Sequence, residues 1–148
     1  MATYSFGDVS ATLAAPGASI ALGAGSANAE EGITLSFTTD RNMMTIGADG
    51  EGMQTKRQDK SGTVTIRLLK TSPTNALLNT AFTAQSVDSA MWGLNVITVS
   101  NSQAGDLWAC RECAFVRIPD YTYAQDGDTV EWEFHAVKVD PVIGAYNV

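Results

Sequence analysis

The feature of this sequence that most constrains its fold is a recurring alternation of apolar and polar residues. Successive side chains of a β-strand point to opposite faces of the sheet, so such alternation is typical of strands with one buried face. The clearest example covers residues 129–139, where Val130, Trp132, Phe134 and Ala136 alternate with Glu131, Glu133 and His135. Shorter runs predict strands over 9–13, 33–38, 62–70, 96–99 and 114–118, and another that begins at Ile20. We therefore expect a mainly β protein.

A single helix is expected within this pattern. Ser72 is a good N-cap, and Pro73 suits the first helical position because its missing N–H would be unpaired there in any case. Apolar residues then recur at a spacing of four, as Leu77 and Ala81 and as Leu78 and Phe82. We expect a helix from about residue 73 to residue 85, whose apolar stripe covers one face or an open end of the sheet structure.

The 22 residues from 40 to 61 separate two clear strands. Loops this long are uncommon in compact domains and are usually functional or disordered. Residues 43–46 can extend as a strand, Asp49-Gly50 is a turn signal, and residues 51–56 can return. We predict a hairpin arm over about 40–61 that carries exposed apolar and basic side chains: Arg41, Met43, Met44, Ile46, Met53, Lys56, Arg57 and Lys60. Such an arm would be a liability unless a partner covers it.

Length and charge set further bounds. The 148 residues predict one domain over 1–148, and 45% hydrophobic with 17% charged residues is typical of globular proteins. The net charge of −7 argues against a basic nucleic-acid-binding surface. Residues 41–70 carry a net charge of +3, between acidic segments of −4 over 1–40 and −6 over 71–148. Between copies of the chain, these segments offer complementary pairing.

Export signals are not expected. The first basic residue is Arg41, so a positively charged leader is missing, and Pro16-Gly17 interrupts the apolar stretch before it. No run of about 18 apolar residues is present, so no transmembrane helix is expected. We expect the protein to be made and kept in the cytoplasm unless something else exports it.

The two cysteines, Cys110 and Cys113, form a lone CxxC. A structural zinc site needs four ligands, and His135 is the only histidine. In a strand, residues three apart face opposite sides of the sheet. Ordinary packing is the favoured interpretation, because most free cysteines are buried hydrophobes. Disulfides between subunits remain a second possibility.

No catalytic site emerges from the other polar residues. His135 shares a strand face with Glu131 and Glu133, but no serine or cysteine nucleophile motif accompanies it. Asp126-Gly127-Asp128 lacks the EF-hand spacing and reads as a hairpin turn. The glycines near residue 23 lack the pattern of a phosphate loop. We expect no cofactor, no metal and no enzymatic activity.

Several segments in a fixed order resemble a known family. They are residues 4–6, 8–12, 29–34, 44–50 and 60–73, followed by Asn75-Ala76 and Leu78. Together they resemble the tail tube proteins of contractile-tailed (myovirus-type) bacteriophages, over most of residues 4–100. The CxxC is not part of this resemblance.

The resemblance implies a β-sandwich or barrel tail-tube fold with one flanking α-helix and a long hairpin arm. Six subunits of such proteins form a ring whose strands line an inner β-barrel, and rings stack with an arm crossing the junction. The implied partners are further copies of the chain, the tail sheath, tape-measure, baseplate and tail-terminator proteins. Double-stranded DNA would pass through without specific binding, and no membrane is involved. The implied location is the virion, after assembly in the host cytoplasm.

An acidic lumen would keep DNA phosphates from sticking during transit. The candidate lumen acids are Asp126, Asp128, Glu131 and Glu133. The basic arm is expected to dock on the acidic face of the next ring. Two other interpretations stay open: a tube of the type VI secretion or pyocin kind, and a monomeric β-sandwich binding module with an exposed aromatic platform.

Overall fold

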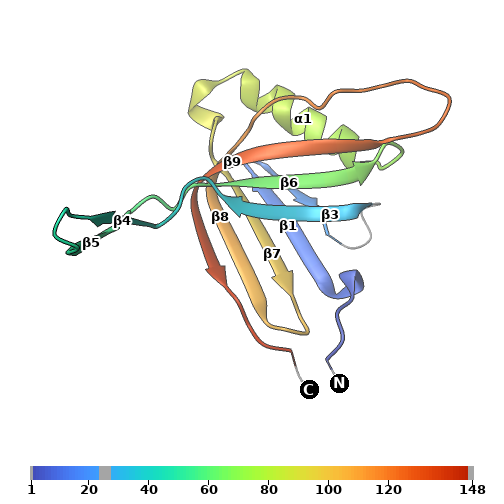
Figure 1. The fold of residues 1–148 in the computed structure, drawn as a ribbon. Helices are drawn as coiled ribbons and strands as arrows, with labels where there is room; N and C mark the ends of the chain where they lie inside the picture. The colour runs from blue at the N-terminus through green and yellow to red at the C-terminus, as the bar shows by residue number, and fades with distance from the viewer. Residues whose placement is uncertain (1, 24–27, 147–148) are drawn as a thin grey trace.

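The computed structural model describes residues 2–23 and 28–146, with the backbone alone for residues 28–31. Its main element is one antiparallel sheet of seven strands in the order β2-β1-β7-β8-β9-β6-β3 (Figure 1). The bounds are β1 Val9–Ala15, β2 Ala18–Ala21, β3 Asn28–Phe37, β6 Gly62–Leu69, β7 Asn95–Asn101, β8 Asp106–Phe115 and β9 Thr129–Val142. A separate two-stranded sheet consists of β4 (Asn42–Ile46) and β5 (Gly52–Lys56). The helix α1 covers Thr74–Ser86, and two short 3-10 turns cover Phe6–Asp8 and Ser89–Met91.

The long strand β9 joins two differently directed parts of the seven-stranded sheet. Its first half pairs with β6, from Thr129 opposite Leu69 to Ala136 opposite Gly62. Its second half pairs with β8 as far as Val142. In Figure 1 the strands β3 and β6 run one way and β1, β7 and β8 another, so the sheet bends around its inner face. This is the expected mainly β fold with one helix and a hairpin arm.

The core fills the inner face of this bent sheet. The fully buried large side chains come from both parts, and they include Leu13, Ile66, Leu68, Ile97, Trp132 and Phe134. Phe115 of β8 connects the parts, because its ring centroid lies 5.9 Å from that of Trp132 and 4.6 Å from that of Phe134. Burying each such side chain stabilises the fold by about 1.5–3 kcal/mol. The alternation in 129–139 therefore identified the core face of β9 correctly.

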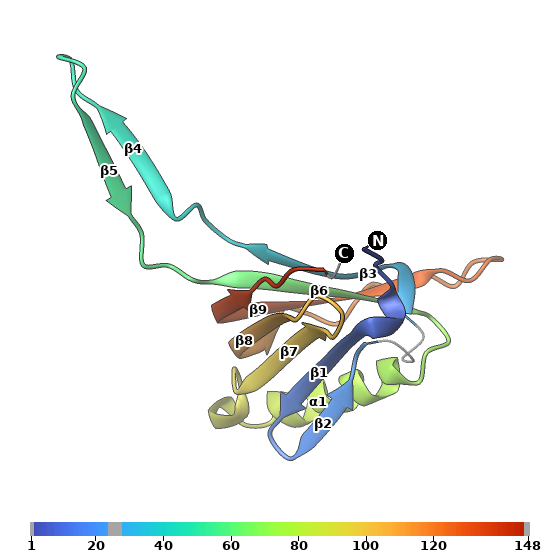
Figure 2. The same ribbon diagram turned by 90° about the horizontal axis from the view of Figure 1, so that it is seen from below.

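The helix α1 packs on the same inner face. It begins at Thr74 with Pro73 at the N-cap, so the prediction of Ser72 as N-cap and Pro73 as first helical residue was wrong by one position. The Ser72 hydroxyl accepts a hydrogen bond from the Thr74 N–H at 3.3 Å. Leu78 and Ala81 are buried, but Leu77 is 53% exposed, so the expected pairing of Leu77 with Ala81 as one buried stripe was wrong. The helix lies beside the β1–β2 hairpin (Figure 2). No helix among residues 2–23 and 28–146 is long and apolar enough to cross a membrane.

Two polar contacts fix the ends of α1. Near its start, Asn75 Oδ1 accepts a hydrogen bond from the Trp132 indole nitrogen at 3.0 Å. Near its end, the amides of Gln85 and Asn95 exchange hydrogen bonds of 2.7 and 2.9 Å. All four side chains are buried, so these bonds specify the position of the helix as well as stabilising it.

One connection differs from the sequence prediction. Asp126-Gly127-Asp128 does not make a tight hairpin turn; it belongs to an irregular loop over 116–128 that projects from the sheet between β8 and β9 (Figure 1). Of the strand predicted over 114–118, only residues 114–115 are in a strand, as the end of the longer β8, which begins at Asp106; the prediction was wrong for 116–118, which belong to the loop. The half-buried Trp108 and Ala109 blur the alternation there, so the first part of β8 gave no clear signal.

Candidate assembly surfaces

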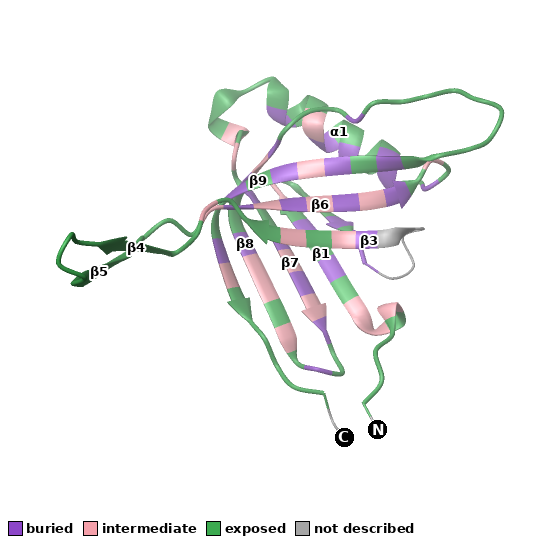
Figure 3. Ribbon diagram, in the orientation of Figure 1, coloured by how far each residue is buried: buried purple, intermediate pink, exposed green. Residues whose placement is uncertain are grey.

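The arm formed by β4 and β5 extends away from the body of the protein (Figures 1 and 2). The two strands pair from Asn42 opposite Lys56 to Ile46 opposite Gly52. The turn between them follows the Asp49-Gly50 signal, with Gly50 at φ +88° and the Gly47 N–H donating to the Glu51 carbonyl at 2.7 Å. Every residue of both strands is exposed (Figure 3). An isolated two-stranded hairpin is at best marginally stable in water.

Both faces of the arm carry apolar side chains. The register places Met43, Thr45, Met53 and Thr55 on one face, which we call the Met43 face. It places Asn42, Met44, Ile46, Gln54 and Lys56 on the other, which we call the Met44 face. The exposed fractions are 51% for Met43, 59% for Met44, 55% for Ile46 and 59% for Met53. A partner that covered one face alone would leave the other in water.

Hydrogen bonds hold the root of the arm. Arg57 N–H donates to the Arg41 carbonyl at 2.8 Å, and Arg41 Nε donates to the Arg57 carbonyl at 3.1 Å. The Asp59 carboxylate accepts from the Ser61 N–H at 2.8 Å and from the Thr39 hydroxyl at 3.1 Å. The bonds from Ser61, and then that from Thr39, lower the pKa of Asp59. These contacts join the two segments of the chain that form the root, and so they direct the arm outward.

An ion-pair network lies next to the root. Lys60 Nζ lies 3.5 Å from Asp140, and Arg111 Nη1 lies 2.8 Å from the same carboxylate. Lys60 also accepts a hydrogen bond from the Val139 N–H through its carbonyl, at 3.0 Å. Lys60 was predicted as part of the arm's contact surface, but in this structure its ammonium is paired with its own chain.

The four candidate lumen acids lie on two different elements. Glu131 and Glu133 point to the outer face of β9, opposite Arg67 and Thr65 of β6. Glu131 lies 3.3 Å from Arg67, which neutralises part of its charge. Asp126 and Asp128 lie in the exposed loop 116–128. His135 is exposed on the same face as the two glutamates, as expected.

Lys70 anchors the loop 116–128 to the sheet. Its ammonium donates to the Thr122 carbonyl and lies 4.2 Å from the centroid of the Tyr123 ring and 5.8 Å from that of Tyr121. Its backbone N–H donates to the Asp128 carbonyl at 3.2 Å. Sequence reasoning missed this contact, because a lysine that ends one strand and tyrosines 51 and 53 positions later share no local pattern.

The two cysteines are free thiols, and both side chains are fully buried. The expectation that they face opposite sides of the sheet was wrong. Glu112 between them adopts a φ of +54°, and this irregularity turns both thiols into the core. Burial raises the pKa of Cys110 to about 11; burial, followed by the neighbouring Cys110, raises that of Cys113 to about 12. A disulfide to another subunit would require the core to open.

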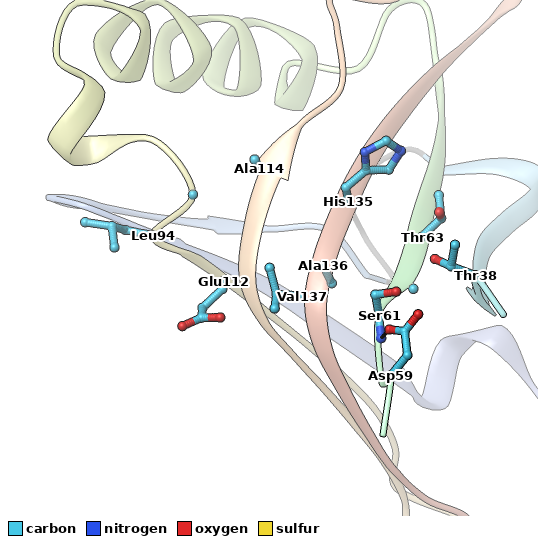
Figure 4. A pocket seen from close by; sticks show the side chains of 12 residues that line it. Thr38, Asp59, Ser61, Thr63, Leu94, Glu112, Ala114, His135, Ala136 and Val137 are labelled. Carbon is cyan, nitrogen blue, oxygen red and sulfur yellow. Dashed lines mark hydrogen bonds between the residues drawn. The ribbon is translucent and has the colours of Figure 1, made fainter. Parts of the chain in front are cut away.

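A groove of about 680 Å³ crosses the outer face of the sheet where it bends (Figure 4). We call it the corner groove. Its apolar lining comes from Leu94, Ala114 and Val137, and its polar lining includes Thr38, Asp59, Ser61, Glu112 and His135. Sequence reasoning missed it, because its walls come from segments that the fold alone brings together. Within the described residues, no three metal-ligating side chains come together.

Comparison with known proteins supports a tube subunit. In a structure titled as the sheath–tube complex of the extracellular contractile injection system PVC, one chain matches with a TM-score of 0.55 and 12% identity, covering 90% of this chain and 88% of that one. A chain of the anti-feeding prophage baseplate matches with a TM-score of 0.58 and 10% identity, covering 96% and 97%. A chain of the anti-feeding prophage tube-terminating cap matches with a TM-score of 0.55 and 9% identity, covering 90% and 88%.

At these identities the structural matches show a shared fold. No curated protein sequence matches the chain. The family model described as bacteriophage PhiTE tail tube protein matches residues 1–144. The chain therefore belongs to the PhiTE family of bacteriophage tail tube proteins.

Proposed function

We propose that six copies of this chain form a ring, and that rings stack into the inner tube of a contractile phage tail through which DNA is delivered. The single observation that carries the proposal is the arm, whose strands expose apolar side chains on both faces. Apolar surface of this kind on a water-soluble body marks a contact with another protein. Membership of a tail tube family favours a second copy of the chain as that protein.

The open edges of the seven-stranded sheet support ring formation. Among residues 2–23 and 28–146, β2 and β3 stand at the two ends of the strand order and are the edge strands of the sheet. Such edges pair readily with other chains. A contact between two different surfaces, repeated around an axis, closes into a ring, whereas the contact between rings stays open and makes a filament.

The charge of the assembly suits DNA passage. A ring of six copies would carry a formal charge of −42, six times the −7 of one chain. We propose that Asp126, Asp128, Glu131 and Glu133 contribute to an acidic lumen that repels phosphates. A tube structure that placed all four on the outer wall would refute this assignment.

The remaining expectations belong to the same proposal. Residues 1–148 act as one tail-tube domain with a structural, non-enzymatic role. Its partners in the tail are the sheath, baseplate, terminator and tape-measure proteins, and DNA passes without specific binding. Assembly takes place in the host cytoplasm, and the product is part of the virion. A tube of a contractile injection system is the second candidate, favoured by the chains from the PVC and anti-feeding prophage structures.

Negative-stain electron microscopy of the purified protein, with its mass measured by light scattering, tests the proposal. Rings with six-fold symmetry or hollow filaments are expected. A species that stays monomeric at high concentration, even after addition of a baseplate initiator, would refute it.

A further inference from the structure

The corner groove exposes apolar side chains that the fold leaves uncovered. Leu94 is 56% exposed and Val137 is 54% exposed, and both line the same groove with Ala114 (Figure 4). Contiguous exposed apolar surface rimmed by polar groups is the mark of an interaction site. The volume of about 680 Å³ lies within the range of clefts that enclose bound groups.

The Met44 face of the arm presents apolar side chains that such a groove could receive. Met44 and Ile46 stand on the same side of β4, and Ile46 lies opposite Gly52. A Cβ added to Gly52 would lie 3.3 Å from Ile46 Cδ1, so the isoleucine leans across the space that the glycine leaves. The Met43 sulfur on the other face already accepts a hydrogen bond from Arg57 Nη2 at 3.4 Å. Met44 and Ile46 therefore form the more purely apolar projection.

The Met44 face also carries a positive charge. Lys56 lies on the Met44 face, because it pairs with Asn42 two residues before Met44. Glu112 lines the corner groove, and its side chain is exposed. We propose that the corner groove of one copy receives the Met44 face of the arm of a second copy, with Met44 and Ile46 against Leu94 and Val137 and with Lys56 beside Glu112. The choice of a second copy as the partner rests on the proposed function.

The groove cannot take its own arm. Thr38, Asp59 and Ser61 line the groove and also belong to the root of the same chain's arm, which projects away from the body (Figures 1 and 4). An arm that arrives from another copy would therefore end beside the root of the next arm. Repeated contacts of this head-to-tail kind link subunits into a continuous series.

Site-directed cross-linking in assembled tubes tests the inference. The variant M44C/V137C is compared with M44C/V142C, because Val142 lies on the same strand and is 58% exposed but does not line the groove. A short bis-maleimide reagent reacts with exposed thiolates, whereas Cys110 and Cys113 are buried with raised pKa values. We expect a ladder of cross-linked multimers from tubes of the first variant and none from the second.

Each outcome decides a different question. Tubes that give no ladder, or an equal ladder for both variants, would overturn the groove assignment and leave the tube function standing. Wild-type protein that makes no tubes would instead count against the tube function. If wild type assembles and the cysteine variants do not, a charge exchange decides: K56E and E112K should each impair assembly, and the double variant should restore it. Failure of that rescue would overturn the proposal.

Discussion

The hydrogen bond between Asn75 and Trp132 gives a quantitative test of how α1 is held on the sheet. Trp132 is 1% exposed and Asn75 is 6% exposed, so water cannot replace either partner. In N75A the indole N–H loses its acceptor at 3.0 Å. Leaving a buried donor unsatisfied costs about 1–3 kcal/mol. N75A also loses the amide bonds to the Leu69 and Lys70 carbonyls, at 3.0 and 3.3 Å.

A double-mutant cycle isolates the bond between the two side chains. W132F removes the indole N–H and also leaves a cavity. The cost of that cavity is the same with and without Asn75, so it cancels in the cycle. The carbonyl bonds of Asn75 are likewise lost in both backgrounds. We therefore expect W132F to cost about 1 kcal/mol less in the N75A background than in the wild type, the usual net contribution of one hydrogen bond.

Urea denaturation followed by circular dichroism measures this coupling, at concentrations where light scattering shows a monomer. With slopes of about 1–3 kcal/mol/M, a coupling of this size shifts the midpoint by about 0.3–1 M. W108F is the matched control. It makes the same substitution at a tryptophan whose ring lies beside Phe37, with centroids 6.1 Å apart, and not at the one that is bonded to Asn75. Additivity of N75A and W132F within about 0.5 kcal/mol would refute the role given to this bond.

Three further predictions follow from the core, the thiols and the arm. F134A should destabilise the monomer by about 3–5 kcal/mol in urea, since Phe134 is 0% exposed, and a loss below about 1 kcal/mol would contradict its place in the core. Cys110 and Cys113 should resist maleimide until the protein unfolds. Folding raises the pKa of Cys110 from 9.0 to about 11 and that of Cys113 to about 12, so the folded state holds protons that the unfolded chain releases. The free energy of unfolding should therefore fall as pH rises through about 9 to 11. Reaction in the folded state at neutral pH would contradict this. Reversing Lys56 and Arg57 to glutamate should change the monomer's stability by less than about 0.5 kcal/mol, since both are exposed, but should shorten the tubes seen by microscopy; unchanged tube length would exclude an electrostatic role.

Period-two patterning made much of the fold predictable. Val64, Ile66 and Leu68 of β6 and Val130, Trp132 and Phe134 of β9 are all buried, as their alternation indicates. The helix was also predictable, because the start expected at about residue 73 lies within one residue of the observed Thr74, although the N-cap is Pro73 and not Ser72. The hairpin arm followed from the Asp49-Gly50 turn between two extendable segments.

Features that depend on long-range geometry were not predictable. The bend at Arg111-Glu112 places Cys110 and Cys113 on one side of the sheet, against the rule for residues three apart in a regular strand. The corner groove is lined by Leu94, Ala114 and Val137, which come from three separate segments that the fold brings together. The exposed acids were visible in the sequence, but the partner of Glu131 is Arg67, which lies 64 positions earlier and becomes a neighbour through strand pairing.

The central claim is that the arm joins copies of this chain into a tube, and removal of the arm tests it most directly. The Arg57 N–H and Arg41 carbonyl are already bonded at 2.8 Å, so a short glycine-serine turn can replace residues 42–56 without disturbing the body. Light scattering over a range of concentrations would compare this variant with the full chain. We predict that the full chain grows into tubes while the shortened chain keeps its circular dichroism and urea midpoint but does not stack. Tubes of equal mass and length from the shortened chain would contradict the account.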